Sequence, residues 1–257
     1  MTLRITACGR SDVGRVRTSN EDSWGVFPEL QFYMVADGMG GHAAGEVASR
    51  LATDVMREFL ETTRQPNEIT WPTDLDRTLP LPIKRLVTAS RLANDKIFHA
   101  SRSNSKFSGM GTTMVSVLIE QNIAHIGHVG DSRAYLVRNG KIQPLTADHS
   151  LVNDYISQGL LTPAEAVRHP LKHVITRALG SNARVDVDVK TLTIQSGDLF
   201  LLCSDGLSNL VNEAEIQARC LEAQSDSKKI CDLLVDLANQ KGGEDNITVV
   251  AISSTAV

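Results

Sequence analysis

Aspartates that follow apolar runs and stand beside glycines are the residues best suited to do chemistry in this chain. Asp37 ends the run at 32–36 and precedes a glycine, and Asp205 repeats this arrangement after a second apolar run. Asp245 precedes a third apolar run, and Asp131 stands at a bend between two more. Each acid alone is typical of a turn. Because carboxylates gathered in one place repel each other, a fold that brought them together would need a divalent cation to keep them ionised.

Such a cation site would have the chemistry of phosphate ester hydrolysis. Carboxylate and backbone carbonyl oxygens suit magnesium and manganese. A site with two ions lowers the pKa of water and holds both oxygens of an in-line displacement. Arg17 supplies a guanidinium that can bind phosphate oxygens bidentately.

Other kinds of site compete with this interpretation. Gly38-x-Gly40-x-x-Ala43 fits a loose dinucleotide fingerprint, but a carboxylate at the turn would repel a pyrophosphate, and the acid expected about 20 residues later falls inside a predicted helix. His125 and His128 lie three residues apart on a predicted strand, so they point to opposite faces and cannot converge on one metal. His42 could cap a helix or take part in proton transfer, and the role of His149 stays open. No cysteine is followed by the arginine of a Cys-x5-Arg loop.

Length and composition predict one domain over residues 1–257 and a soluble protein. The chain is 42% hydrophobic with a formal net charge of −4, which allows one large core. No basic cluster favours nucleic acid or an anionic membrane, and no apolar run approaches the roughly 18 residues of a membrane span. The cysteines form no Cys-x-x-Cys pair, so a reducing cytoplasm is the simplest location.

A predicted hairpin would bring the N-terminal acids to Asp37. Strands are predicted at 24–27 and 32–37, with only four residues, 28–31, between them. The polar, glycine-punctuated segment 9–22 is predicted as a loop. Residues 17–22 and Asp37 would therefore meet at the same end of a sheet.

The remaining periodic segments predict sheets covered by helices. Asn139-Gly140 between apolar runs favours a tight hairpin. The proline-rich segment 62–82 is predicted as an irregular surface insertion, and residues 146–179 as a flap over one end of the molecule. Helices are predicted at 44–59, 83–100, 214–221 and 228–239, and further strands at 112–119, 123–129, 133–137, 142–145, 199–203 and 247–252.

In order and spacing, these motifs resemble the metal-dependent serine/threonine protein phosphatases of type 2C, the PPM family, in their compact bacterial form. The resemblance covers nearly the whole chain. It implies an α+β fold, a four-layer αββα sandwich of two mainly antiparallel sheets flanked by helices, with a flap subdomain. The matching segments are Arg17-x-x-Asn20-Glu21-Asp22, Ala36-Asp37-Gly38-Met39-Gly40-Gly41, Gly109-Met110-Gly111-Thr112-Thr113, Gly127-His128-Val129-Gly130-Asp131-Ser132-Arg133, Thr146-Ala147-Asp148-His149-Ser150, Ile175-Thr176-Arg177-Ala178-Leu179-Gly180, Ser204-Asp205-Gly206-Leu207 and Asp245-Asn246-Ile247-Thr248.

The resemblance also implies a set of metal ligands. By it, Asp37 bridges two manganese or magnesium ions and the Gly38 carbonyl binds one of them. Asp205 and Asp245 complete the other, and Asp131 matches the position associated with a weaker third ion.

The catalytic residues that the resemblance implies are Arg17, which would hold the phosphate, and Glu21 and Asp22, which would support the attacking water. The chain departs from the animal enzymes at Met39, where they carry a histidine proposed as general acid. Water or His42 would then have to supply the proton to the leaving group.

The expected activity is hydrolysis of phosphoserine and phosphothreonine in proteins by direct attack of a water that the two metal ions activate. The expected partners are phosphorylated proteins and a cognate serine/threonine kinase, and the expected state is a monomer. The alternative is a catalytically weak module of the same fold that binds or senses phosphoproteins. Loss of the metal-binding acids would indicate that alternative, and none of them is missing.

Overall fold

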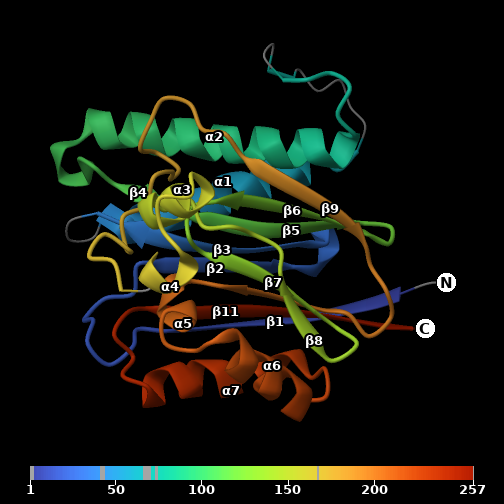
Figure 1. The fold of residues 1–257 in the computed structure, drawn as a ribbon. Coiled ribbons are helices and arrows are strands. Elements are labelled where there is room, and N and C mark those ends of the chain that lie inside the picture. Colours follow the sequence, from blue (N-terminus) through green and yellow to red (C-terminus); the bar gives the residue numbers. More distant parts are fainter. Residues whose placement is uncertain (1–2, 41–43, 66–70, 73–74, 167, 257) are drawn as a thin grey trace.

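Two β-sheets stack face to face, and helices cover both outer faces (Figure 1). The structure is a computed structural model that describes residues 3–40, 44–65, 71–72, 75–166 and 168–256. Every pair of neighbouring strands in this part of the chain is antiparallel. The arrangement confirms the predicted α+β sandwich.

One sheet has five strands and the other six in the part of the chain that the structure describes. The first sheet has the order β1-β11-β10-β7-β8, and the second has the order β2-β3-β5-β6-β9, with β4 paired to β3. Their bounds are β1 (Leu3–Asp12), β2 (Asp22–Phe27), β3 (Phe32–Met39), β4 (Gly111–Thr112), β5 (Met114–Glu120), β6 (Ile123–Val129), β7 (Arg133–Arg138), β8 (Lys141–Pro144), β9 (Asp188–Thr193), β10 (Leu199–Cys203) and β11 (Ile247–Ala256).

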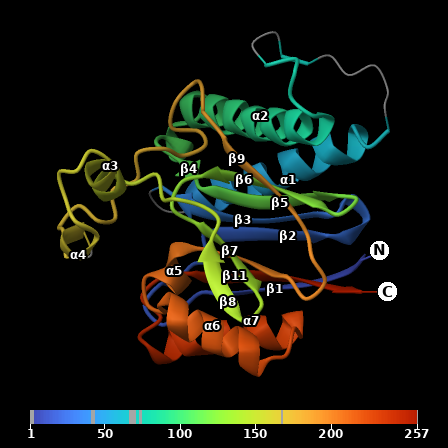
Figure 2. The same ribbon diagram turned by 45° about the vertical axis from the view of Figure 1, so that its right-hand side comes forward.

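Helices α1 and α2 cover the second sheet, and α6 and α7 cover the first (Figure 1). The short helices α3 and α4 project from the sandwich within the predicted flap (Figure 2). Among the described residues, no helix is both long and apolar enough to cross a membrane. The helix bounds are α1 (Ala44–Thr62), α2 (Leu81–Ser103), α3 (Leu151–Ser157), α4 (Pro163–Ala166), α5 (Asp205–Ser208), α6 (Glu213–Glu222) and α7 (Ser227–Gln240), with single 3-10 turns at η1 (Pro28–Leu30) and η2 (Ser105–Phe107).

Strand alternation explains why the central strands are apolar throughout. In β3, Phe32 and Met34 pack toward α1 and α2, whereas Tyr33 and Val35 pack into the core between the sheets. Successive side chains of a strand point to opposite faces, and both faces are covered here. Strand β10 is buried on both faces in the same way. The fully apolar runs that end near Asp37 and Asp205 are therefore central strands.

Two strands differ from the sequence prediction. Residues 9–12 belong to β1 and pair with β11, with Gly9 opposite Val250 and Asp12 opposite Ile247, so the predicted loop at 9–22 is wrong at its start. A polar side chain of this segment finds its partner far along the chain: Arg10 forms an ion pair with Asp232. Strand β9, which the sequence did not predict, pairs with β6 at the edge of its sheet, and its residues are mostly exposed or half-buried.

The predicted hairpins are present. Strands β2 and β3 pair directly. Strands β7 and β8 turn at Asn139 and Gly140, whose φ angles of 52° and 74° are both positive, as a two-residue hairpin of this kind requires. In the segment predicted as an insertion at 62–82, α1 ends at Thr62 and α2 begins at Leu81, and residues 66–70 and 73–74 lie outside the described residues.

The start of α1 lies against β3 at Gly38. A Cβ atom added at Gly38 would come 2.1 Å from the backbone oxygen of Gly45 and 2.5 Å from that of Glu21. Backbone atoms of a helix and a neighbouring strand end cannot move aside as a flexible side chain can. Glycine at this position therefore allows helix, strand and N-terminal loop to meet beside Asp37.

We expect Gly38→Ala to lower the free energy of unfolding by about 2 kcal/mol or more, because overpacking against backbone forces the elements apart. Gly111→Ala is the matched control, since Gly111 pairs with the next residue of β3 and its added Cβ would come no closer than 3.1 Å to another atom. Urea denaturation of both variants measures the difference. Equal losses in the two variants would contradict the close approach at Gly38.

Candidate active site

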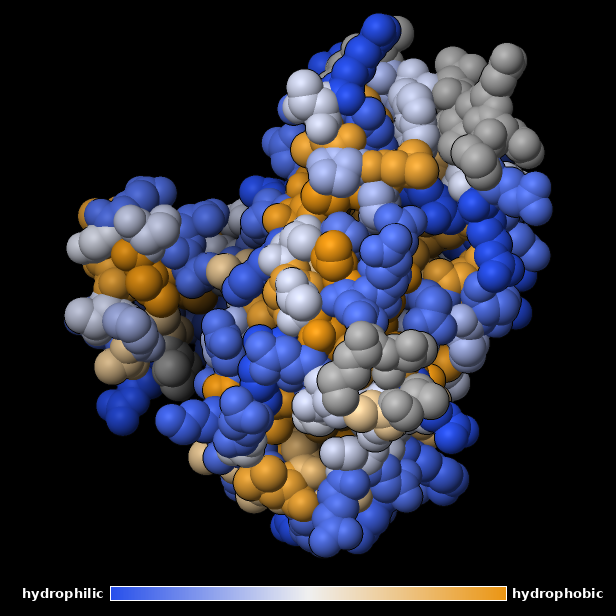
Figure 3. Space-filling view, turned by 90° about the vertical axis from the view of Figure 1, so that its right-hand side faces the viewer, coloured by the Kyte–Doolittle hydropathy of each residue, from blue (hydrophilic) through white to orange (hydrophobic). Residues whose placement is uncertain are grey.

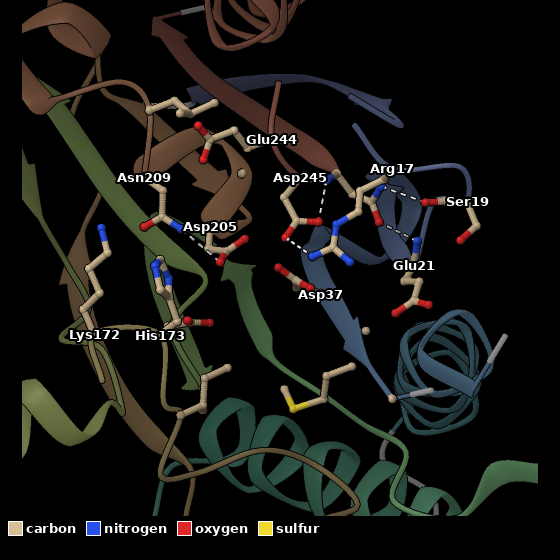
Figure 4. A pocket seen from close by; sticks show the side chains of 18 residues that line it. Arg17, Ser19, Glu21, Asp37, Lys172, His173, Asp205, Asn209, Glu244 and Asp245 are labelled. Atoms are coloured by element: carbon tan, nitrogen blue, oxygen red, sulfur yellow. Dashed lines mark hydrogen bonds and ion pairs between the residues drawn. The ribbon is translucent and has the colours of Figure 1, made fainter. Parts of the chain in front are cut away.

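An acidic pocket opens at one end of the sandwich (Figure 4). Its cavity volume is ≈ 590 Å³. Both sheets contribute acids to its walls, and the labelled side chains of Asp37, Asp205 and Asp245 point toward the same space. The predicted site residues that line it are Arg17, Glu21, Asp37, Gly38, Asp131, Asp205 and Asp245.

The second sheet positions the N-terminal acids through its strand register. Asp22 stands directly opposite Asp37 in the β2–β3 pair, as the predicted hairpin requires. Asp131 comes from the turn after β6, where Gly130 adopts a φ of 109°. A Cβ atom at Gly130 would come 2.7 Å from Thr113. Positive φ and close packing together favour glycine before Asp131.

The first sheet positions the C-terminal acids. Asp205 is the first residue of α5, two residues after the end of β10. Asp245 stands two residues before β11, the strand that pairs with β10. Because β10 and β11 are antiparallel neighbours, the end of one and the start of the other lie at the same edge of the sheet. This edge faces the Asp37 end of β3.

Asp22 lies behind the pocket wall and is held from the opposite sheet. Its Oδ2 atom accepts hydrogen bonds from Ser204 Oγ at 2.8 Å and from Thr248 Oγ1 at 2.6 Å. Its Oδ1 atom is buried and has no hydrogen-bond partner. Burial raises the pKa of Asp22 to about 7, against the opposing effect of these two hydrogen bonds. A buried, unpartnered carboxylate oxygen is a costly group that fits a cation.

Burial and mutual repulsion raise the pKa values of the other acids as well. Burial is the largest cause of the raised pKa of Asp37, followed by the charges of Asp22 and Asp205. Burial raises the pKa of Asp131 to about 7, with the Asp205 charge adding to it. The pKa of Asp205 is raised by burial and then by Asp245. The pocket therefore favours protons, or other positive charge, on its carboxyl groups.

Arg17 stands at the rim, paired with one of the acids. Its Nη2 atom lies 2.7 Å from Asp245 Oδ2 (Figure 4), and the Arg17 side chain is 55% exposed. This hydrogen bond raises the pKa of Arg17. The sequence placed Arg17 and Asp245 in one site but did not anticipate that they bind each other. The guanidinium thus offsets part of the negative charge in the pocket.

Asn246 ties the N-terminal loop to the start of β11. Its Nδ2 atom donates to the backbone oxygens of Val13 and Ser19, at 3.0 and 2.9 Å, and its Oδ1 atom accepts from the backbone N–H of Glu21 at 2.8 Å. Glu21 is half-buried, and burial raises its pKa. The loop that carries Arg17 and Glu21 is therefore attached beside Asp245.

The donor set fits hard divalent cations, although it is not a finished ligand shell. Within the described residues, no three His, Cys, Asp or Glu side chains converge closely enough to surround one ion. The unpartnered Oδ1 of Asp22 and the raised pKa values of Asp37 and Asp205 nevertheless indicate a site that is deficient in positive charge. Oxygen atoms alone favour magnesium or manganese over zinc.

Several residues that line the acidic pocket were not singled out in the sequence. Lys172 and His173 come from the flap, Asn209 follows α5, and Glu244 precedes Asp245. Lys172 and His173 are ordinary surface residues by sequence, and only the fold shows that they reach the pocket. Met39 lines it too, whereas His42 lies outside the described residues.

His149 joins the base of the flap to the turn that carries Asp131. Its Nδ1 atom accepts a hydrogen bond from the backbone N–H of Gly130 at 2.9 Å, and the backbone N–H of His149 donates to the backbone oxygen of Gly130 at 2.8 Å. Its Nε2 atom lies 3.3 Å from Asp188, near but without hydrogen-bond geometry. The ring stacks on His128, whose pKa burial lowers to about 4. The open role of His149 is thus answered by a structural contact.

Comparison with known proteins agrees with this geometry. Residues 9–242 match the family described as protein phosphatase 2C. A Listeria innocua protein named serine/threonine phosphatase stp is 39% identical over 247 residues, which cover 95% of this chain and 93% of that protein. The crystal structure of the Mycobacterium tuberculosis serine/threonine phosphatase PstP/Ppp superposes with a TM-score of 0.84 at 34% identity, over 100% of both chains. The catalytic domain of PstP in complex with two manganese ions gives the same TM-score at 33% identity, over 99% of this chain and 100% of that one.

The fold, the site and the relatives together show that this protein is a serine/threonine protein phosphatase. Within that class, the chain belongs to the protein phosphatase 2C family. The resemblance found in the sequence motifs is confirmed.

In metal-free protein, we expect the free energy of unfolding of Asp131→Asn to increase relative to that of the wild type as pH rises. The pKa of Asp131 is raised from 3.8 to about 7, so the folded state holds this proton more tightly than the unfolded chain. The stability that the protonated Asp131 side chain contributes is fully present below about pH 4 and is lost as pH rises through about 7. Asparagine cannot ionise. Between about pH 5 and pH 8, the melting temperature of the variant relative to wild type should rise by about 3 °C or more.

Thermal melts in a chelator measure this difference. Asp54→Asn, an exposed position on α1, is the matched control and should keep a constant offset from the wild type. An Asp131→Asn offset that is equally constant would show that burial does not raise this pKa.

We expect His149→Gln to lose about 1–3 kcal/mol of unfolding free energy, since the buried N–H of Gly130 is left without its acceptor. His149→Asn should lose less, because asparagine Oδ1 occupies nearly the place of Nδ1. Hydrogen exchange at the Gly130 amide should quicken in His149→Gln and stay slow in His149→Asn. Equal exchange in both variants would contradict the contact.

Proposed function

We propose that this phosphatase hydrolyses phosphoserine and phosphothreonine esters of proteins with two divalent cations, manganese or magnesium, in the acidic pocket. The observation that carries the proposal is the convergence of carboxylates from both sheets around one pocket, with a buried Asp22 oxygen left unpartnered. The PstP catalytic domain, similar over nearly its whole length, holds two manganese ions.

The chain would supply ligands to each ion, with Asp37 shared between them. Asp37 and the Gly38 carbonyl would hold one, Asp37 would bridge to the other, and Asp205 and Asp245 would complete it. Asp131, at the pocket edge nearer the flap, would hold a weaker third ion. When bound, the cations would lower the pKa of water and balance the charge of the phosphate oxygens.

The acids behind the ligands would orient solvent. Asp22 is held by Ser204 and Thr248, so its free Oδ1 atom has a set direction. Glu21 lines the pocket from the loop that Asn246 attaches. Both would accept hydrogen bonds from water at the site and keep it aligned for attack.

Arg17 would bind the phosphate. It lies at the rim with an exposed side chain, and its only partner among the described ion pairs is Asp245. A cation on Asp245 would compete with that pair and leave the guanidinium free for the phosphate oxygens, which match its fork geometry. The phosphate group would then be held between Arg17 and the acids.

Proton delivery to the leaving group does not come from the position used in animal enzymes. Met39 has no proton to give, and it lines the pocket where they carry a histidine. Water or His42 would supply the proton. The presence of every ligand acid favours turnover over the alternative of a module that only binds phosphoproteins.

The expected substrates and cellular location follow from this activity. The substrates would be phosphoproteins made by a serine/threonine kinase, and the enzyme would act as a monomer in the cytoplasm, where its unpaired cysteines suit reducing conditions. Residues 1–257 would act as one catalytic domain with the flap at about 146–179.

We expect the purified protein to hydrolyse p-nitrophenyl phosphate and phosphothreonine peptides with added manganese and not after chelation. Asp37→Asn and Asp205→Ala should each lower kcat/KM by at least about 100-fold, because each removes a metal ligand. Asp54→Asn, with the same loss of a carboxylate on an exposed face of α1, should retain wild-type turnover. Full activity in Asp37→Asn, or turnover that survives chelation, would refute the assignment.

A further inference from the structure

Helix α7 packs on the outer face of the first sheet, and two cysteines lie in this contact. The layer that holds α6 and α7, at the bottom of Figure 3, turns mainly hydrophilic residues to solvent beside a smaller hydrophobic patch. Cys231 belongs to the buried side of α7. Cys8 belongs to β1, at the edge of the sheet, and packs against the same apolar cluster as Cys231. Two thiols that are 223 residues apart in the sequence therefore meet between helix and sheet.

The thiol of Cys231 lies against residue 8 itself. Its Sγ atom is 3.3 Å from the backbone oxygen of Cys8 and 3.7 Å from that of Val249, so its S–H can donate to either. Burial raises the pKa of the Cys231 thiol to about 12, and the charge of the Cys8 thiol and a hydrogen bond with it contribute. The pKa values of Cys203 and Cys220 are raised first by burial, and no other thiol contributes to them. Cys8 and Cys231 are therefore neighbours in a way that the other cysteines are not.

The two thiols differ in their access to solvent. Cys231 is fully buried, whereas Cys8 is half-buried on an edge strand. A small oxidant can therefore reach Cys8 from solvent, and Cys231 only by way of Cys8. The thiolate is the form that reacts with oxidants, so the raised pKa of Cys231 protects it from direct oxidation. An accessible thiol beside a protected one is the arrangement of a redox-sensing cysteine and its resolving partner.

We propose that Cys8 and Cys231 form a reversible disulfide when the protein meets hydrogen peroxide. The Cys8 sulfur attacks one peroxide oxygen, the O–O bond breaks, and Cys8 becomes a sulfenic acid while the other oxygen leaves as water. The Cys231 sulfur then attacks the Cys8 sulfur, the S–O bond breaks, and the departing hydroxide takes the Cys231 proton to form a second water. Two thiols are oxidised to one disulfide and one peroxide is reduced, and a thiol reductant restores both cysteines.

This bond would join the two elements that lead into the rim of the acidic pocket. Strand β1 continues into the loop that carries Arg17, and α7 continues toward Asp245. The two connections already meet where the backbone N–H of Arg15 donates to the Gly243 oxygen at 2.7 Å. A covalent link across 223 residues removes conformational freedom from the unfolded chain. The oxidised protein is therefore the more stable form, and this holds whether or not the proposed function is correct.

Mass spectrometry of the oxidised protein tests the proposal. Purified protein would be incubated with a chelator and a dose of hydrogen peroxide that fully oxidises free glutathione, then denatured with N-ethylmaleimide. Of the four cysteines, only Cys203 and Cys220 should be alkylated, and trypsin should release peptides 5–10 and 230–241 joined to each other. Dithiothreitol before alkylation should restore all four thiols. The oxidised form should melt about 4 °C or more above the reduced form.

Cysteine variants separate this pair from the other thiols. Cys8→Ser and Cys231→Ala should each abolish the joined peptides and the rise in melting temperature. Cys8→Ser changes a half-buried residue of an edge strand, so it keeps the test valid if the core variant Cys231→Ala folds poorly. Cys220→Ala is the matched control, because it removes a buried thiol on α6 and leaves the proposed pair in place. This control should still form the bond and be alkylated only at Cys203.

Several results would overturn the disulfide. Four alkylated thiols in the treated wild type would do so, as would a sulfinic acid at Cys8 beside a free Cys231. A disulfide that still forms in Cys8→Ser, or one that includes Cys203 or Cys220, would also contradict it. A bond between Cys8 and Cys231 that lowers the melting temperature would show that the native packing does not place these thiols for bonding, and would overturn the proposal as well. None of these results depends on phosphate hydrolysis, so the proposed function is tested separately.

Discussion

Electrostatic repulsion among buried carboxylates is the constraint on which this structure depends. Asp22, Asp37, Asp131 and Asp205 all have raised pKa values, with burial as the largest cause and the charges of neighbouring acids as a further one. Moving such groups from water into the protein without partners is unfavourable. The apolar layers between the sheets and beneath the helices must offset that cost, and the site is complete only when positive charge balances the acids.

The two sheets hold the site jointly. Asp22 belongs to β2 of one sheet, but its hydrogen bonds come from Ser204 and Thr248 beside and within strands of the other. Asn246 makes a similar connection from the start of β11 to the loop at 13–21. Neither sheet alone could position these acids. The site therefore forms only when the two sheets pack together. A substitution that disturbs the packing between the sheets would also displace the acids of the site.

The flap is attached to the sandwich at its base and projects from it farther out (Figure 2). At its base, His149 forms reciprocal hydrogen bonds with Gly130, next to Asp131, so the flap and this acid are fixed to each other. Farther out, α3 and α4 form one side of a second hollow that adjoins the acidic pocket. The sandwich thus carries the acids, while the flap projects beside them, as loops on stable scaffolds commonly do.

Local patterns in the sequence determined much of the fold and pointed to most of the acids that line the pocket. The apolar run before Asp37, the glycine after it and the periodic apolar residues of α1 are local signals, and Asn139-Gly140 specified its hairpin through backbone conformation alone. These features depend on interactions between residues near each other in the chain, so a reading of spacing and residue type could find them. The acids that end or enter the strands then followed from strand position.

Contacts between distant segments decided the rest. Residues 9–12 look like a polar loop, yet they form a strand because β11, more than two hundred residues later, offers a hydrogen-bonding edge. The pair between Arg17 and Asp245, the attachment of Asp22 to Ser204, and the approach of His173 to the acidic pocket all join segments that no local pattern relates. A strand edge or an ion pair needs a partner in space, and the partner is set by how whole sheets pack rather than by the residues on either side.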